Sequence, residues 1–300
     1  MPMMTHPPSM DRTTIKLCSW NSRGHGADRM VYIDDLMNRC DILVLQEHWL
    51  SDYDLHKLTH SLSVLGVSGM DPHQARVGRP FGGCALLHKT GYRCSIEPVP
   101  TDSRRLCACI VNIPNVIKFI LFNVYMLCDA FYSHDDAVYR DVLNSIESLM
   151  NVHYDVDHII VAGDLNTDVT RIRSVHASLL KECCNRLGLK LCLSSAHSSV
   201  DFTYHNEASG SRSILDHFIV SENLFSSIAA YSCAHDGDNL SDHFPVFLEL
   251  NVNTTYTPQV NDTRAHAGSR PSWQRASADH IAAYRRRLQE LLNSVLIPTE

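Results

Sequence analysis

Carboxylate and amide side chains follow an apolar run abruptly at Asp164 and Asn166, in the stretch GDLN. Similar polar side chains stand at five further strand-like runs, namely Asn21, Glu47, Asn123, Tyr125, Asp216, Asp242 and His243. A single Asn or Asp after a strand usually caps a turn. Six strand ends or starts with such groups instead predict one shared site, because strand ends of a mixed sandwich converge on one cleft. Gly163, just before the pair, lets backbone and substrate approach closely.

The types of these side chains suit the hydrolysis of a phosphate ester. Glu47, Asp164 and Asp242 supply hard oxygen ligands without an accompanying cysteine, which favours Mg²⁺ or Mn²⁺ over zinc. The donors suited to phosphate oxygens are Asn21, Asn166, Tyr125 and His243. Asp216 can hold His243 in one tautomer and raise its basicity. A metal, hydrogen-bond donors and a carboxylate that orients water together allow phosphoester hydrolysis.

These residues must be positioned by strand-like apolar runs, which alternate with amphipathic segments over most of the chain. The predicted strands span residues 15–20, 41–47, 82–89, 106–113, 117–125, 158–163, 214–221 and 244–252. The predicted helices span 28–39, 134–151 and 174–187. Several strands are apolar at successive positions, as expected where helices cover the outer faces of sheets. There are too few crossover helices for one parallel sheet. We therefore expect a four-layered α/β sandwich, with two mixed β-sheets packed face to face and helices outside.

The ends of the chain differ in character from this central part. Residues 1–14 have no apolar core and predict a disordered tail. Residues 253–273 lack periodicity and predict a linker, and residues 274–297 predict an amphipathic helix. The predicted domain therefore spans residues 15–252.

Composition excludes several classes of protein. The 300 residues are 44% hydrophobic and 20% charged, as in an ordinary globular protein. Eleven cysteines without paired zinc-ligand spacing predict reduced thiols and an intracellular protein, nuclear or cytoplasmic and not secreted. No apolar run reaches the roughly 18–20 residues that span a bilayer, so no membrane association is expected. A net charge of −7 gives no global attraction to nucleic acid, so phosphate binding must come from local groups or a metal.

Six short motifs resemble the ordered set of the endonuclease/exonuclease/phosphatase superfamily, which includes deoxyribonuclease I and apurinic endonucleases. They are WN at 20–21, QE at 46–47, NVY at 123–125, GDLN at 163–166, LDHF at 215–218 and SDH at 241–243. Within the superfamily, DFTYHN at 201–206 followed by SRSILDHFIVS is most similar to the endonuclease domain of non-LTR, LINE-type retrotransposon polyproteins. The segment RPSWQRASADHIAAYRRRL resembles the connector from that endonuclease to a reverse transcriptase.

The resemblance implies a role for each matching residue. Glu47 would be the principal metal ligand, with Asn21 and Asp242 close to the metal or the scissile phosphate. Asp164 would orient and deprotonate the attacking water. The groups implied to stabilise the transition state are Asn166, Tyr125 and His243, the last oriented by Asp216. The positions implied to support the phosphate are Asn123, Thr203 and Ser241, and no organic cofactor is implied.

The implied function is a Mg²⁺-dependent DNA endonuclease, with Mn²⁺ as an alternative ion. It would nick target DNA, leaving 5′-phosphate and 3′-hydroxyl ends for target-primed reverse transcription. Its partners would be DNA and a reverse transcriptase domain downstream in the same polyprotein, and the domain itself would be monomeric. Two alternatives stay open: the same fold acting on an RNA tail, nucleotide, phosphoinositide or phospholipid, or a catalytically inactive scaffold.

Overall fold

A computed structural model describes residues 12–58, 62–70, 81–129 and 133–253 of the chain. The predicted helix at 274–297, and all of the predicted linker except Asn253, lie outside the described residues. Arg12, Thr13 and Thr14, which the sequence placed in the tail, instead extend the first strand and pair with residues 251–253. The rest of the predicted tail lies outside the described residues.

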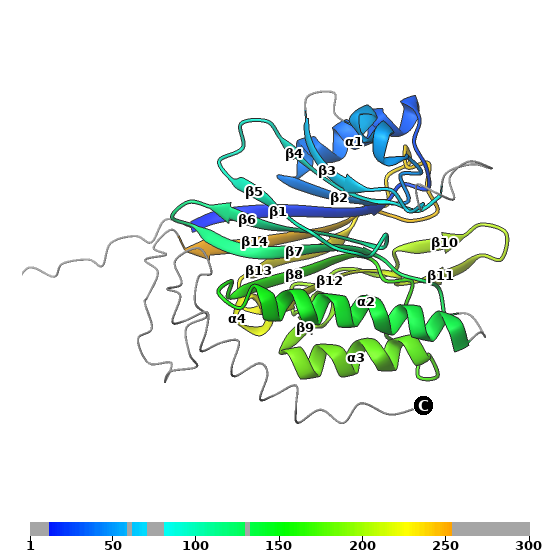
Figure 1. The fold of residues 1–300 in the computed structure, drawn as a ribbon. Helices are drawn as coiled ribbons and strands as arrows, with labels where there is room; N and C mark the ends of the chain where they lie inside the picture. Colours follow the sequence, from blue (N-terminus) through cyan, green and yellow to red (C-terminus); the bar gives the residue numbers. More distant parts are fainter. Residues whose placement is uncertain (1–11, 59–61, 71–80, 130–132, 254–300) are drawn as a thin grey trace, which may run out of the picture. The chain divides into compact units, whose positions relative to one another are not determined.

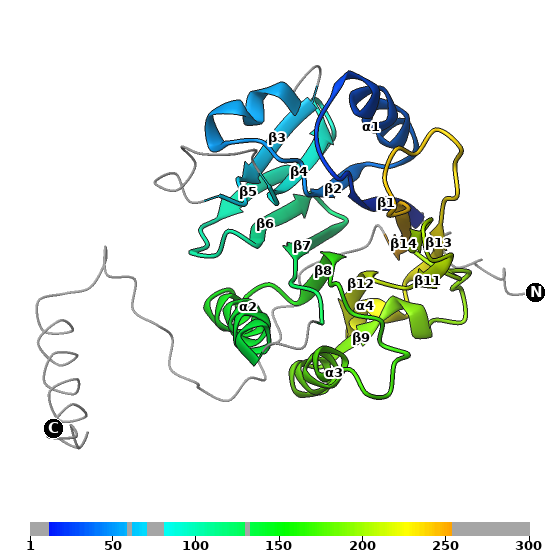
Figure 2. The ribbon, with the colours of Figure 1, turned by 90° about the vertical axis from the view of Figure 1, so that its right-hand side faces the viewer.

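Two six-stranded sheets form the centre of the molecule (Figures 1 and 2). The first holds, in spatial order, β13 (Ile228–Cys233), β14 (Val246–Asn253), β1 (Arg12–Asn21), β2 (Ile42–Gln46), β4 (Cys84–Lys89) and β3 (Leu62–Val67). The second holds β5 (Ser95–Val99), β6 (Leu106–Ile113), β7 (Ile117–Tyr125), β8 (His158–Asp164), β12 (Asp216–Ser221) and β9 (Leu189–Leu191). A separate hairpin consists of β10 (Tyr204–Asn206) and β11 (Ser211–Ser213). Both sheets are mixed, because β1 pairs parallel to β2 and β7 parallel to β8, while their other strand pairs are antiparallel.

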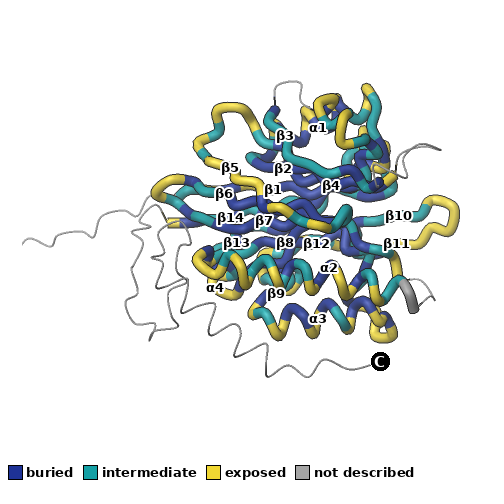
Figure 3. Tube along the Cα trace, in the orientation of Figure 1, coloured by how far each residue is buried: buried dark blue, intermediate teal, exposed yellow. Residues whose placement is uncertain are grey.

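Helices cover the outer faces of both sheets. Figure 1 shows α1 (Ala27–Arg39) on the first sheet, and α2 (Ser133–Val152) and α3 (Val175–Leu187) on the second. The short helices are η1 (Asp52–Leu58), η2 (Cys192–Ser194) and α4 (Glu222–Phe225). One apolar cluster lies between the sheets, a second under α2 and α3, and a third under α1. Figure 3 shows the buried positions concentrated along the central strands. The predicted four-layered α/β sandwich is therefore confirmed.

The strand directions explain why distant polar residues meet. Parallel strands end at the same edge of a sheet, so β1 and β2 bring Asn21 and Glu47 together, and β7 and β8 bring Tyr125 and Asp164 together. Strands β12 and β14 run antiparallel to these neighbours and therefore begin at that edge. Asp216 accordingly pairs directly with Asp164 in the sheet.

Two further predictions concern cysteines and membranes. All eleven cysteines are free thiols, and most of them are buried. Among the described residues, no helix is both long and apolar enough to cross a bilayer.

Candidate active site

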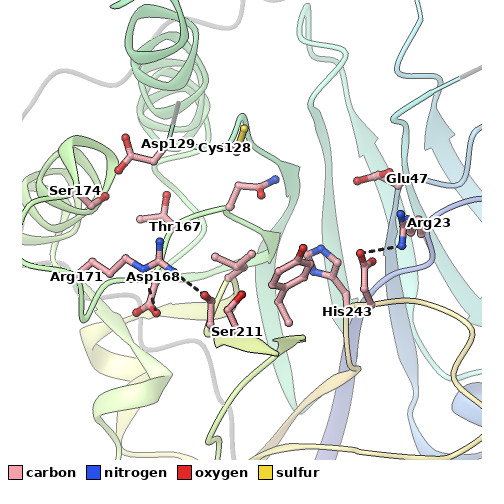
Figure 4. Close-up of a pocket in the computed structure, with 15 residues that line it drawn as sticks. Arg23, Glu47, Cys128, Asp129, Thr167, Asp168, Arg171, Ser174, Ser211 and His243 are labelled. Atoms are coloured by element: carbon pink, nitrogen blue, oxygen red, sulfur yellow. Dashed lines mark hydrogen bonds and ion pairs between the residues drawn. The ribbon is translucent and has the colours of Figure 1, made fainter. Parts of the chain in front are cut away.

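A pocket of about 410 Å³ opens at this edge of the two sheets. Figure 4 shows Glu47, Arg23 and His243 at one end of it, and Thr167, Arg171, Ser174 and Asp129 at the other. Four of the residues predicted from the sequence line it, namely Glu47, Asn166, Asp242 and His243. The others lie behind or beside this lining. The structure therefore brings both sheets' predicted residues to one open cavity.

Asn21 joins the two sheets at the back of the pocket. Its amide nitrogen donates to Glu47 Oε1 at 3.0 Å and to Asp164 Oδ2 at 2.9 Å. Its amide oxygen accepts from the backbone N–H of Arg23 at 3.0 Å. All of its hydrogen-bonding atoms are thus committed to protein groups. This arrangement indicates that Asn21 positions the two carboxylates, and its predicted closeness to the metal or the scissile phosphate stays a prediction.

The GDLN turn is built around the Asp164 carboxylate. Asp164 is fully buried, and its Oδ1 accepts from the backbone N–H of Asn166 at 2.8 Å, as in an Asx turn. Asn166 has a φ of 48°, and its side chain donates to Met126 O at 2.9 Å and Asp164 Oδ2 at 3.2 Å. The predicted turn and the predicted site therefore coexist in the same residues.

Gly163 has a structural reason different from the one predicted. Its φ is +136°, and a Cβ there would lie 2.1 Å from the carbonyl oxygen of Val124 on the neighbouring strand. The close approach seen in the structure is thus between β8 and β7.

His243 stands between two buried carboxylates. Its Nδ1 lies 2.9 Å from Asp216 Oδ2, and its Nε2 lies 3.8 Å from Asp164 Oδ2. Asp216 is fully buried, and both of its carboxylate oxygens lie within hydrogen-bond distance of His243 Nδ1. The predicted Asp216–His243 pair is present, and it leaves Nε2 directed toward Asp164 and the pocket.

Burial and charge shift the pKa values of this group in opposite directions. Burial raises the pKa of Asp164 to about 7, although His243 counteracts the shift. Burial by itself would lower the pKa of His243, but the charges of Asp216 and Asp164 raise it to about 10. The site therefore pairs a carboxylate that accepts a proton readily with an imidazole that keeps its proton at neutral pH.

Tyr125 lies beside these groups without lining the pocket. Burial and the nearby Glu47 carboxylate raise the pKa of its hydroxyl well above the ordinary value. The phenol is therefore a hydrogen-bond donor at neutral pH. The Arg105 guanidinium lies 5.4 Å from the centre of its ring.

Asp242 is paired with a cation that sequence reasoning did not single out. Its Oδ2 lies 2.9 Å from Arg23 Nη1. Because the Arg23 guanidinium compensates the charge of Asp242, Glu47 is the better candidate for a metal ligand. Glu47 is held by Asn21 and by the indole N–H of Trp49, which donates to its Oε2 at 3.1 Å.

Thr203 and Ser241 support the site from behind. Thr203 Oγ1 accepts from the backbone N–H groups of Leu215 and Asp216 at 2.9 and 3.0 Å. Ser241 Oγ donates to the carbonyl of Asn21 at 2.7 Å and accepts from the backbone N–H of His243 at 3.2 Å. Both hydroxyls therefore fix catalytic candidates in place, and neither lines the pocket.

Asn123, predicted to contact phosphate, ties the sheets together instead. It is fully buried, and its Nδ2 donates to the carbonyls of Leu45 at 2.9 Å and Ala85 at 2.8 Å. Both carbonyls belong to the first sheet, whereas Asn123 is in the second. Its Oδ1 accepts from Gln46 Nε2 at 2.7 Å. No polar atom of the side chain is left for a substrate, so a phosphate contact by Asn123 is not supported by this geometry.

Replacing Asn123 by Ala is expected to lower the free energy of unfolding by about 3 kcal/mol, because buried polar partners lose their hydrogen bonds and a small cavity forms. Urea unfolding followed by circular dichroism measures the change. Asn38→Ala, at an exposed position of α1, is the control and should lie within about 0.5 kcal/mol of the parent protein. A loss below about 1 kcal/mol for Asn123→Ala would contradict the role assigned to this amide.

Four residues of the site were missed from the sequence. Trp49 and Arg23 each follow a predicted site residue by two positions, and that spacing was the available signal. Tyr204 lines the pocket with its ring 5.0 Å from that of His243. Arg171 lines the opposite end and donates to Ser213 Oγ at 2.7 Å. Tyr204 lies within the DFTYHN motif, which was the available signal for it. The sequence carries no signal for Arg171, because its position depends on the loop after β8.

Acidic and histidine clusters in the described part of the chain can hold a divalent metal. Asp164, Asp216 and His243 form one such cluster, with ligand atoms within 4.8 Å of one another. In this cluster, however, His243 Nδ1 and the Asp216 carboxylate already hydrogen-bond to each other. Glu47 fits a hard cation better, because its carboxylate lines the open pocket and has lone pairs beyond those that accept from the Asn21 amide and the Trp49 indole N–H.

Comparison with known sequences identifies one family. A model of the Endonuclease/Exonuclease/phosphatase family matches residues 18–243. A comparison with curated protein sequences gave no match. The matched span begins within β1 and ends at His243, so it contains every polar residue of the site described above.

Several solved structures share the fold. The endonuclease domain of TRAS1, a telomere-specific non-LTR retrotransposon, matches with a TM-score of 0.61 and 14% identity, covering 79% of this chain and 98% of that domain. The catalytic domain of APE2 from Xenopus laevis matches with a TM-score of 0.61 and 16% identity, covering 80% and 92%. The 3′ phosphatase NExo from Neisseria, bound to a product DNA hairpin, matches with a TM-score of 0.58 and 17% identity, covering 79% and 99%. At these identities the likeness establishes the fold.

Proposed function

The chain belongs to the endonuclease/exonuclease/phosphatase family, and from this premise we propose that it is a Mg²⁺-dependent DNA endonuclease. The observation that carries the proposal is the meeting of Glu47, Asp164 and the Asp216–His243 pair at one pocket. Such a pocket offers a carboxylate for a metal, a carboxylate for a water and a cationic donor for phosphate. The products would be a 5′-phosphate and a 3′-hydroxyl.

The order of events follows from where each group lies. Asp164 is buried behind Asn166 and His243, which line the pocket, and we propose that the attacking water reaches its carboxylate from that side. There Asp164 orients the water for in-line attack on phosphorus and takes its proton. The raised pKa of Asp164, about 7, suits that transfer near neutral pH.

Hydrogen-bond donors beside Asp164 stabilise the negative charge that develops on the phosphate oxygens. His243 keeps its proton at neutral pH and points Nε2 toward the pocket, where it donates to a non-bridging oxygen. Asn166 and Tyr125 are proposed as neutral donors to the same oxygens, and Asn166 would exchange its hydrogen bond to Asp164 Oδ2 for one to the phosphate. Preorganised donors of this kind stabilise the transition state more than the substrate.

Glu47 is proposed as the principal protein ligand of the cation, with Asp242 nearby after release from Arg23. A bound Mg²⁺ supplies charge compensation for the phosphate oxygens and the leaving 3′-oxygen. Asn21 holds Glu47 and Asp164 at a fixed spacing, so that the cation and the water face one phosphate.

A supercoiled plasmid tests the proposal. With Mg²⁺, the protein is expected to convert supercoiled plasmid to the nicked circle, and sequencing of the ends should find 3′-hydroxyl and 5′-phosphate groups. The conversion should stop with a chelator and in the Glu47→Gln variant. Nicks that persist in Glu47→Gln would come from a contaminant, and the absence of nicks in the parent protein would overturn the endonuclease assignment.

The substrate class is separated by a panel of phosphoesters. The same pocket on the same fold can act on an RNA tail, a nucleotide, a phosphoinositide or a phospholipid, and a scaffold would cleave none of them. DNA is expected to have the highest kcat/KM. A phosphoinositide or 3′-phosphorylated end that is cleaved faster than plasmid DNA would replace the proposed substrate.

We also propose that nicking serves target-primed reverse transcription. The proposal rests on the resemblance of residues 201–221 to retrotransposon endonucleases and on the fold shared with the TRAS1 domain. The predicted helix at 274–297 would then begin the connector to a reverse transcriptase. Extension of the 3′-hydroxyl at the nick by an added reverse transcriptase and RNA template tests the coupling.

A further inference from the structure

A second cluster of metal-ligating side chains lies apart from Glu47 and the Asp216–His243 pair. Asp129 follows β7, Asp136 is in α2 and His176 is in α3, and one ligand atom of each lies within 4.8 Å of the others. Asp129 also lines the pocket, at the end away from Glu47 in Figure 4. The three residues therefore come from separate elements and meet where α2 and α3 pack together.

His176 is the unusual member of the cluster. It is fully buried, yet neither ring nitrogen makes a hydrogen bond to any described residue. A buried imidazole without a hydrogen-bond partner is costly, because its polar nitrogens have lost their hydrogen bonds to water. Binding of a ligand to one of these ring nitrogens would offset that cost.

The position of the nearest carboxylate shows what kind of ligand fits. His176 Nε2 lies only 3.1 Å from Asp136 Oδ1, but the two groups are not aligned as a hydrogen bond. Two ligands of one tetrahedral ion, each about 2.0–2.1 Å from it, lie about 3.3 Å apart, with neither atom on the other's lone-pair axis. The observed contact matches that relation.

The imidazole is also held in a fixed orientation. Its ring stacks on Tyr139 with centroids 4.0 Å apart and planes at 22°. The Tyr139 hydroxyl in turn accepts a hydrogen bond from Thr167 Oγ1 at 3.1 Å. Locking a ligand ring before the ion arrives reduces the entropy lost on binding.

We propose that Asp129, Asp136 and His176 bind a divalent transition-metal ion, with Zn²⁺ as the reference ion and a water as the fourth ligand. An imidazole with two carboxylates favours Zn²⁺ over Mg²⁺, which prefers oxygen ligands and retains its waters. The site is separate from the proposed nuclease site, because none of its ligands contacts Glu47, Asp164 or His243 through a hydrogen bond or ion pair in the described residues.

Competition with a chromophoric zinc chelator, in excess Mg²⁺, measures the site in the full chain. The parent protein is expected to bind one more equivalent of Zn²⁺ than the Asp129→Asn, Asp136→Asn double variant. Each single variant should weaken that Zn²⁺ equivalent at least about tenfold. Asp141→Asn, at an exposed position of the same helix, makes the same charge change and should leave binding unchanged.

Two additional measurements separate this site from other sources of binding. Glu47→Gln should retain the Zn²⁺ equivalent, so failure of the nuclease proposal would not affect it. Replacement of Zn²⁺ by Co²⁺ should give visible absorption without the near-ultraviolet band of a thiolate ligand, which excludes capture by cysteine. Equal Zn²⁺ binding by the parent and double variant, loss in Glu47→Gln, or a thiolate band would each overturn the proposal.

Discussion

Replacing Asp164 by Asn is expected to lower the rate constant of plasmid nicking by about 10²–10⁴-fold, the range usual for loss of a general base. An amide cannot take a proton from the attacking water. The substitution also replaces one acceptor oxygen by an NH₂ donor. Asn21 Nδ2 and Asn166 Nδ2 both donate to Asp164 Oδ2, so the oxygen of the new amide is expected to take the Oδ2 position. Single-turnover nicking of supercoiled plasmid, with enzyme in excess, measures the chemical step free of product release.

The matched control for this variant is Asp168→Asn. Asp168 is a second carboxylate of the same loop and pocket, but its Oδ1 is occupied by the backbone N–H and hydroxyl of Thr170. Its loss should change the nicking rate by less than about tenfold. Asp164→Asn should still bind a plasmid-derived duplex, because it removes a negative charge from the pocket. A nicking rate within tenfold of the parent protein would rule out Asp164 as the base.

The sequence predicted the inner strands of both sheets and missed the outer ones. The eight predicted strands are β1, β2, β4, β14, β6, β7, β8 and β12, which occupy the interior positions of the two sheets. The four missed strands of these sheets, β3, β5, β9 and β13, are their edges. Most interior strands are covered on both faces and read as continuous apolar runs, as in β2, where all five residues are buried. The edge strands carry more partly or fully exposed positions, and Pro98 interrupts β5, so their pattern is weak.

The sequence also predicted which residues belong to the site, but not which way each of their side chains faces. Residues at strand ends, such as Asp164 and Glu47, could be recognised because an apolar run stops where a polar group begins. Whether such a residue faces the pocket or the opposite sheet depends on contacts between sheets. Asn123 shows the difference, since it lies two residues before the end of β7 and reaches carbonyls of β2 and β4. Sequence spacing cannot specify that partner, because it lies on the other sheet.

A double-mutant cycle on His243 and Asp216 should show that the two act as one unit. His243→Ala is expected to lower kcat/KM for nicking by about 10²–10³-fold, as for loss of one transition-state donor. Asp216→Asn alone should lower it less, because the imidazole stays in place but loses the charge 2.9 Å from Nδ1. The double variant should be no slower than His243→Ala, because Asp216 has nothing left to orient. Losses that multiply in the double variant would show that Asp216 acts independently.

The pH dependence of the Asp216→Asn variant gives the electrostatic part of this coupling. The charges of Asp216 and Asp164 raise the pKa of His243 to about 10, so the parent imidazole stays protonated across the range from pH 7 to 9. Removing the Asp216 charge lowers that pKa toward the ordinary value of about 6.5. Because the protonated form exists below the pKa, nicking by Asp216→Asn should fall relative to the parent protein as pH rises from 7 to 9. A constant ratio over that range would mean that Asp216 only positions the ring, since a purely geometric role does not depend on the proton.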